Sequence, residues 1–245
     1  MSPVAHDMPT ISDLALKITL RVVGANEASQ IIPEDGSGPL SVASALSDFF
    51  ELATGLEAED QTLAVDAATE LAHHALDLAD RLSYQLRQLD IHDQQAALAS
   101  LFASLAVWFA RRGAELENLA GVADGFARLV NGETSAAELT NLRHLMNEVL
   151  VAATAAVKAD EDRSNPWRPW RVLNLNMGIA ATRSLDPQLM GDTFDALGER
   201  LPDDLPGFFA DGRRQMEMQD VPQEVRDVFA RYSEKWPLRA PRLDG

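Results

Sequence analysis

The sequence predicts an all-α protein, an array of about nine antiparallel helices packed as a helical repeat or as a bundle. Two observations predict this class. Apolar residues recur every three or four positions along most of the chain, which is the spacing of one helix face. Pro, Gly, Ser and Asp separate these runs, at positions where helices usually begin or end. Hydrophobic residues form 46% of the 245 residues, enough to build a core.

The first helix is the least certain element, because residues 11–23 fit two patterns. Alternate residues are apolar as in a strand, but Ile11, Ile18 and Val22 also share one helix face. Thr10 or Ser12 as N-cap and Gly24 as C-cap favour a helix, and a lone strand would lack a partner. Residues 1–10 contain two prolines and no periodicity, so we expect a mobile tail there.

The later helices follow from periodicity and capping residues. Ser41 is the expected N-cap of the second helix, Pro166 the first residue of a helix that ends near Arg183, and Pro187 and Pro222 begin two more. The other expected helical segments are 60–89, 93–112, 116–130 and 135–158. We group the chain into a tail (1–10), acidic N-terminal helices (11–90), middle helices (91–158), repeat-like hairpins (159–237) and a frayed end (238–245), all in one continuous domain.

Charge and composition exclude several classes of function. The net charge is −17, and residues 22–80 hold twelve acids with neither Lys nor Arg. Such a surface repels nucleic acid; it either docks a basic partner or is simply solvated. The chain has no cysteine, no apolar run long enough to cross a membrane and no secretory signal, so we expect a cytoplasmic protein without thiol chemistry or membrane insertion. No cofactor motif appears, and we expect none bound.

An internal repeat is the most specific pattern in the chain. Pro187-Gln188, Asp192, Phe194 and Glu199 recur 35 residues later as Pro222-Gln223, Asp227, Phe229 and Glu234. A period of this length, covering two helices, is typical of arrays of helical hairpins. Pro-capped helices also resemble one another through capping chemistry, which is the alternative explanation.

The second half of the chain resembles the tetratricopeptide repeat. Phe194 and Phe229 are each followed eight residues later by Pro, and Gly178 stands where that repeat brings its helices close together. The resemblance covers residues 169–237, and it departs from the pattern at Asn174, Met190, Val225 and Arg213. It implies a concave surface that binds a peptide or protein.

Two clusters are candidate sites. The first could ligate a divalent metal through Glu70, His73, His74 and Asp77, with His144 from another helix; the alternative is a solvated acidic face. The second is a basic aromatic island that could bind an anion or stack on an extended ligand. Its arginines could instead pair with Asp160, Glu161 and Asp162. The island comprises Trp167, Arg168, Trp170 and Arg171.

These observations favour a non-enzymatic adaptor that binds a protein or peptide partner through the island beside the repeats. The alternative is a metal-dependent helical-bundle enzyme that uses the Glu70 cluster. A third possibility is electrostatic docking of a basic partner on the acidic N-terminal half.

Overall fold

The computed structural model describes residues 2–59, 62–217 and 221–238. Within these ranges the chain is all-α, as predicted, and it has no strand. It has eleven helices there, more than the nine or so expected, because one predicted helix is divided and α10 was not predicted. None of the described helices is long and apolar enough to cross a membrane. The helices are α1 (Met8–Ser29), α2 (Pro39–Ala58), α3 (Val65–Gln88), α4 (Gln95–Ala110), α5 (Ala120–Gly132), α6 (Ala136–Ala152), α7 (Ala155–Ala159), α8 (Pro169–Arg183), α9 (Pro187–Arg200), α10 (Leu205–Glu217) and α11 (Gln223–Lys235).

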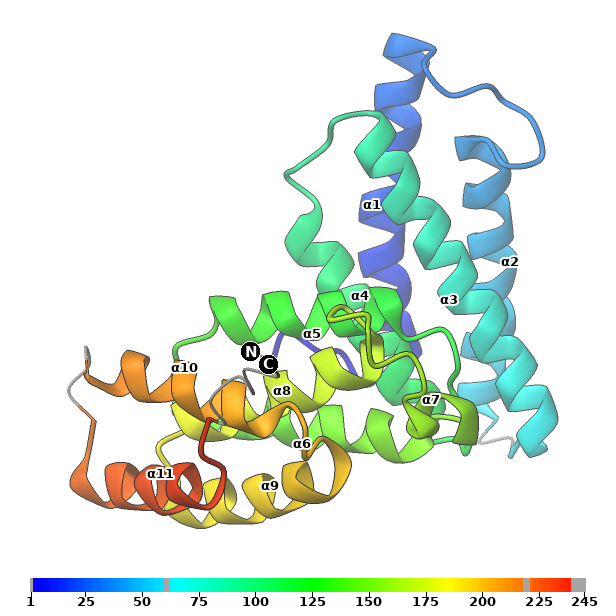
Figure 1. The fold of residues 1–245 in the computed structure, drawn as a ribbon. Helices are drawn as coiled ribbons and strands as arrows, with labels where there is room; N and C mark the ends of the chain where they lie inside the picture. The colour runs from blue at the N-terminus through cyan, green and yellow to red at the C-terminus, as the bar shows by residue number, and fades with distance from the viewer. Residues whose placement is uncertain (1, 60–61, 218–220, 239–245) are drawn as a thin grey trace, which may run out of the picture.

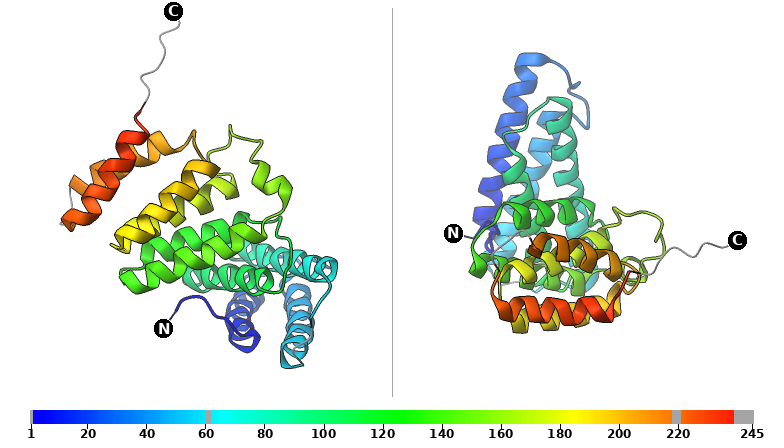
Figure 2. Two further views of the ribbon diagram at one scale, coloured as in Figure 1. Left: turned by 90° about the horizontal axis from the view of Figure 1, so that it is seen from below. Right: turned by 60° about the vertical axis from the view of Figure 1, so that its left-hand side comes forward.

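The helices form two groups that share one core. Figure 1 shows α1, α2 and α3 standing upright beside one another, while the helices from α5 onward lie across their lower ends. The later helices follow one another as a stack, which Figure 2 shows from below. Helix α4 packs against α1, α3, α5 and α6, so it joins the two groups. Every side chain of α4 from Leu98 to Phe109 is buried, and the continuous hydrophobic core runs from Val4 to Tyr232.

The N-terminal segment is ordered, so the prediction of a mobile tail over residues 1–10 was wrong for residues 2–10. The side chains of Val4 and Met8 are buried, and the Ala5 amide donates to Ser104 Oγ on α4. Asp7 caps α1 by accepting from the Thr10 amide. Residues 11–23 are helical, as predicted. The expected frayed end, 238–245, lies outside the described residues except for Leu238.

Helix α1 continues past Gly24, the predicted C-cap, to Ser29. Gln30 is the actual C-cap and adopts the left-handed conformation with φ 54°. The buried Asn26 side chain holds the loop that follows. Its amide donates to the Ile32 carbonyl, and its oxygen accepts from the Ile32 amide. This pairing substitutes for backbone partners that the chain lacks after the helix.

Several helix starts differ from the predicted ones by a few residues. Pro39 and Pro169 occupy the first turns of α2 and α8, where the missing N–H has no helical acceptor to lose. Helix α2 therefore begins before the predicted N-cap Ser41, and α8 begins after Pro166, its predicted first residue. Helix α9 begins at Pro187 as predicted, and Asp186 caps it by accepting from the amides of Gln188 and Leu189.

The predicted helix over 135–158 is interrupted by a contact distant in sequence. The Leu116 amide donates to the Ala152 carbonyl, and its carbonyl accepts from the Thr154 amide. These two bonds form a parallel bridge between Leu116 and Ala153, which ends α6. Thr154 then caps the short α7.

Two glycines set the packing of the C-terminal hairpins. A Cβ at Gly178 would lie 2.8 Å from Leu197 Cδ1 of α9 and 2.9 Å from a Phe208 ring carbon of α10. A Cβ at Gly212 would lie 2.4 Å from Phe229 Cζ of α11. Both positions therefore require glycine for close approach. The second glycine stands one residue before Arg213, the position that a strict 35-residue offset indicates.

Candidate functional site

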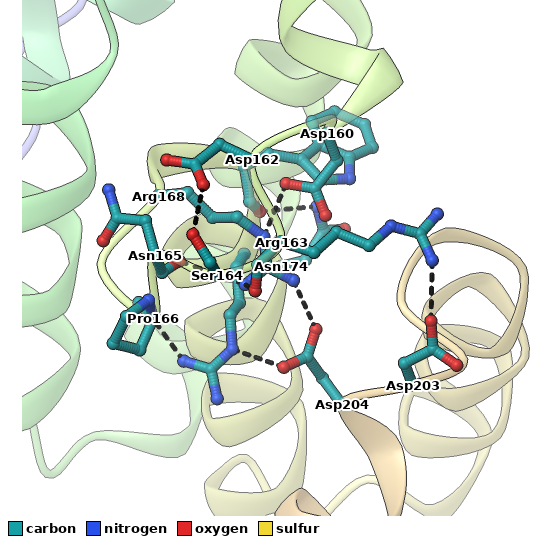
Figure 3. Close-up of polar contacts among 12 residues, drawn as sticks. Asp160, Asp162, Arg163, Ser164, Asn165, Pro166, Arg168, Asn174, Asp203 and Asp204 are labelled. Carbon is teal, nitrogen blue, oxygen red and sulfur yellow. Dashed lines mark hydrogen bonds and ion pairs between the residues drawn. The ribbon is translucent and has the colours of Figure 1, made fainter.

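The arginines of the predicted basic island are held in ion pairs with aspartates (Figure 3). Arg168 Nε donates to Asp160 Oδ1 at 2.6 Å, and Nη2 donates to Asp204 Oδ2 at 2.7 Å. The Arg168 side chain is only 10% exposed. Burial alone would lower its pKa, but the two carboxylates outweigh burial, so the pKa is raised. Arg168 thus remains charged and fully partnered inside the protein.

The neighbouring arginines extend this network toward the loop before α10. Arg171 Nε donates to Asp204 Oδ1, and its Nη1 donates to the Pro166 carbonyl. Arg163 pairs with Asp203 at 2.6 Å, in a more exposed position. Asp160 is a partner as the sequence suggested, whereas Asp203 and Asp204 are not local. They lie 40 and 36 residues after their arginines, and only the tertiary structure brings them together.

The two tryptophans of the island have opposite environments. Trp167 is 81% exposed and Trp170 is 6% exposed. Trp170 packs on the core, with the Arg200 guanidinium 5.9 Å from its ring centroid. Trp167 is the member of the island whose surface is available to a ligand, so binding by the whole set of Trp167, Arg168, Trp170 and Arg171 stays a prediction that would require breaking ion pairs.

The candidate metal ligands do not converge. Across the described part of the chain, no three His, Asp or Glu side chains are arranged to hold a metal ion. Glu70, His74 and Asp77 are exposed on α3, His73 is partly buried, and His144 is exposed on α6. Asp77 instead accepts from Asn118, which also donates to Asp80 Oδ2 at 2.7 Å. This cluster therefore gives no geometric support to a metal enzyme.

A groove between α1 and α2, which no sequence pattern predicted, is a further candidate site. Its floor consists of Ala15, Leu46 and Phe50, all buried, together with Thr19. The Thr19 hydroxyl is buried and has no hydrogen-bond partner. Small side chains keep the groove open, because Ser12, Ala43 and Ser47 line its walls.

Exposed apolar residues and acids border this groove. Leu16 lines it and is 54% exposed, and Leu20 on the same helix is 63% exposed. Across the groove, Glu51 lines both this cleft and a second depression on α2, which also contains Asp48 and Leu52. Helix α2 contains neither Lys nor Arg. An apolar cleft with an acidic border suits an amphipathic partner that carries positive charge.

No protein-family model, characterised protein or solved structure shows significant similarity to the chain.

Proposed function

We propose that this protein is a non-enzymatic adaptor whose α1–α2 groove binds an amphipathic helix with basic flanking residues. The observation that carries the proposal is the open apolar groove, with exposed leucines on one side and acids on the other. Binding a helix there would bury Leu16 and remove apolar surface from water, which supplies the main driving force. The acids would speed association and select basic partners.

The charge distribution supports a heterologous partner over a second copy of the chain. Two copies that met through this surface would bring Asp48 and Glu51 of each α2 into the same interface. Like charges in an interface are unfavourable. A basic helix has no such penalty, and its affinity should fall as salt screens the attraction. This proposal locates the predicted partner site on the acidic N-terminal helices rather than on the island at Trp167.

The direct test is peptide binding. Two fluorescent amphipathic peptides of about 15 residues would share one leucine face and carry either Lys or Glu on their flanks. Fluorescence anisotropy would measure binding to the full chain at low and high salt. We expect the Lys peptide to bind, more weakly as salt rises, and the Glu peptide to bind poorly. Failure of both peptides to bind would contradict the proposal.

Matched variants locate the site. Ser47→Trp places an indole in the groove, whereas Ser44→Trp adds the same side chain at an exposed α2 position outside it. We expect the first variant to abolish binding and the second to retain it. Equal effects would place the peptide elsewhere. Size-exclusion chromatography of the free protein would detect self-association that depends on Ser47, and that result would replace the heterologous partner with a second copy.

A further inference from the structure

Two arginines on facing helices lack acidic partners. Arg143 of α6 donates through Nε to Thr193 Oγ1 at 2.9 Å, on α9. Arg200 of α9 donates to the side-chain oxygens of Asn147 on α6 and Asn174 on α8, each at 3.2 Å. Within the residues that the structure describes, no carboxylate lies at ion-pair distance from either guanidinium. Neutral oxygens hold both cations in place.

This arrangement is energetically unusual because both side chains are partly buried. Burial lowers the pKa of Arg143 and of Arg200, and Arg143 lowers the pKa of Arg200 further through charge repulsion. Asp192 and Glu199 oppose these effects only from a distance. Elsewhere Arg168, whose side chain is 10% exposed, is paired with two carboxylates. An uncompensated pair of partly buried cations is expected to need an anion.

Both guanidinium groups keep hydrogen-bond donors that no acceptor among the described residues occupies. Thr193 accepts from Arg143 Nε, and Arg143 Nη1 lies 3.5 Å from His144 Nδ1. Arg143 Nη2 has no hydrogen-bond acceptor among the described residues. Each Nη of Arg200 makes one bond to an asparagine and has a second hydrogen to give. The Asn147 amide nitrogen has no acceptor among the described side chains and backbone. Guanidinium groups held in this way match the oxygens of a tetrahedral anion.

We propose that Arg143 and Arg200, with the Asn147 amide, bind a phosphate monoester between α6 and α9. The phosphate group is carried either by a small molecule or by a phosphorylated side chain of a partner. The site is independent of the α1–α2 groove, because it lies on different helices and uses charge of the opposite sign.

Thermal unfolding of the full chain tests the site, with inorganic phosphate as the probe and sodium chloride at equal ionic strength as the reference. We expect phosphate to raise Tm in the wild type. Arg143→Gln and Arg200→Gln should each weaken phosphate binding by about tenfold or more. Arg163→Gln, at an exposed ion pair, should leave phosphate binding unchanged. No phosphate-specific shift in the wild type would overturn the proposal.

Asn147→Asp keeps the test decisive if an arginine variant does not fold. The new carboxylate would accept from Arg200 in place of the amide oxygen, so it would supply the missing negative charge internally. We expect this variant to be more stable than wild type and insensitive to phosphate. Retained phosphate binding in a folded Asn147→Asp protein would overturn the proposal. A phosphoserine peptide and its unphosphorylated twin, compared with glycerol phosphate, would then separate the two sources of the phosphate group.

Discussion

The Arg112 guanidinium lies over the Trp108 ring, 3.5 Å from its centroid, and both side chains donate to Glu57 Oε1. The second oxygen of Glu57 accepts from the Met8 amide at 2.7 Å. One carboxylate near the end of α2 therefore ties together the start of α1 and the end of α4. These contacts join α1 and α2 to α4, the helix that links the two groups of the fold.

Removing this carboxylate should loosen the N-terminal helices. We expect Glu57→Ala to lower the free energy of unfolding by about 2–4 kcal/mol, because a buried amide, an indole N–H and a cation lose their acceptor. Urea denaturation followed by circular dichroism measures the change. Asp48→Ala, at an exposed position of the same helix, is the control, with a change within about 0.5 kcal/mol. Equal losses in both variants would contradict a joining role for Glu57.

Two adjacent aspartates that pair with arginines in or near the island should contribute differently to stability. Asp204 is 16% exposed and serves two arginines, whereas Asp203 is 74% exposed and pairs with Arg163. Asp204→Asn should destabilise the fold by about 3 kcal/mol, since it leaves buried Arg168 undercompensated. Asp203→Asn should cost less than about 1 kcal/mol. Chemical denaturation of the two variants gives the comparison, and a smaller loss for Asp204→Asn would refute this network.

Glycine substitutions should change stability in opposite directions. Gly178→Ala forces a Cβ against Leu197 and Phe208, and we expect a loss of about 1–3 kcal/mol from overpacking. Gly24 lies inside α1 with nothing within 4 Å of a Cβ, so Gly24→Ala should add about 0.5–1 kcal/mol by restricting the unfolded chain. Differential scanning calorimetry would show the Tm falling in the first variant and rising in the second. The same sign in both would contradict the packing described here.

Asp80 should make stability depend on pH. Burial raises its pKa in the folded protein, and Asp77 raises it further, while the Asn118 hydrogen bond acts in the other direction. A carboxyl with a raised folded pKa destabilises the fold once it ionises, so its penalty is complete above that pKa and disappears as pH falls toward the unfolded value of 3.8. Asp80→Asn should therefore stabilise the protein at pH 7. We expect a gain of only roughly 0.5 kcal/mol, because Asp80 is partly exposed and solvent weakens the effect.

Denaturant unfolding of wild type and Asp80→Asn between neutral and acidic pH would test this linkage. The advantage of the variant should shrink as pH decreases and vanish below both pKa values. Asp66→Asn, at an exposed position on the same helix, should show a smaller advantage at neutral pH. An advantage of Asp80→Asn that grows on acidification would contradict the stated direction of the pKa shift.

The sequence predicted the helices better than their ends or their partners. Local periodicity was sufficient for α3 and α4, and Pro187 correctly marked the start of α9. The break after α6 depends on Leu116, which is distant in sequence, so periodicity continued through it. Val4 and Met8 were assigned to a tail because two buried side chains in so short a segment leave no periodic signal.

The candidate sites were harder to predict for the same reason. Arg168 and Asp160 are eight residues apart, so their pairing was foreseeable, whereas Asp204 is brought to them by the α8–α9 hairpin. Four of the five metal candidates share α3, and spacing on that one helix could not show whether His144 on α6 lies near them. The α1–α2 groove depends on small residues on two helices. Arg143 and Arg200 stand out only because no carboxylate in the described part of the folded chain lies at ion-pair distance from them. Neither leaves a local motif.

The bond between Arg168 and Asp204 also decides where this protein can be shortened. Asp204 follows α9, so a chain ending at Arg200 would retain every helix through α9 and yet leave the Arg168 guanidinium with Asp160 as its remaining carboxylate. A fragment that keeps this ion pair must therefore extend at least through Asp204, so the end of α9 is not a sufficient boundary.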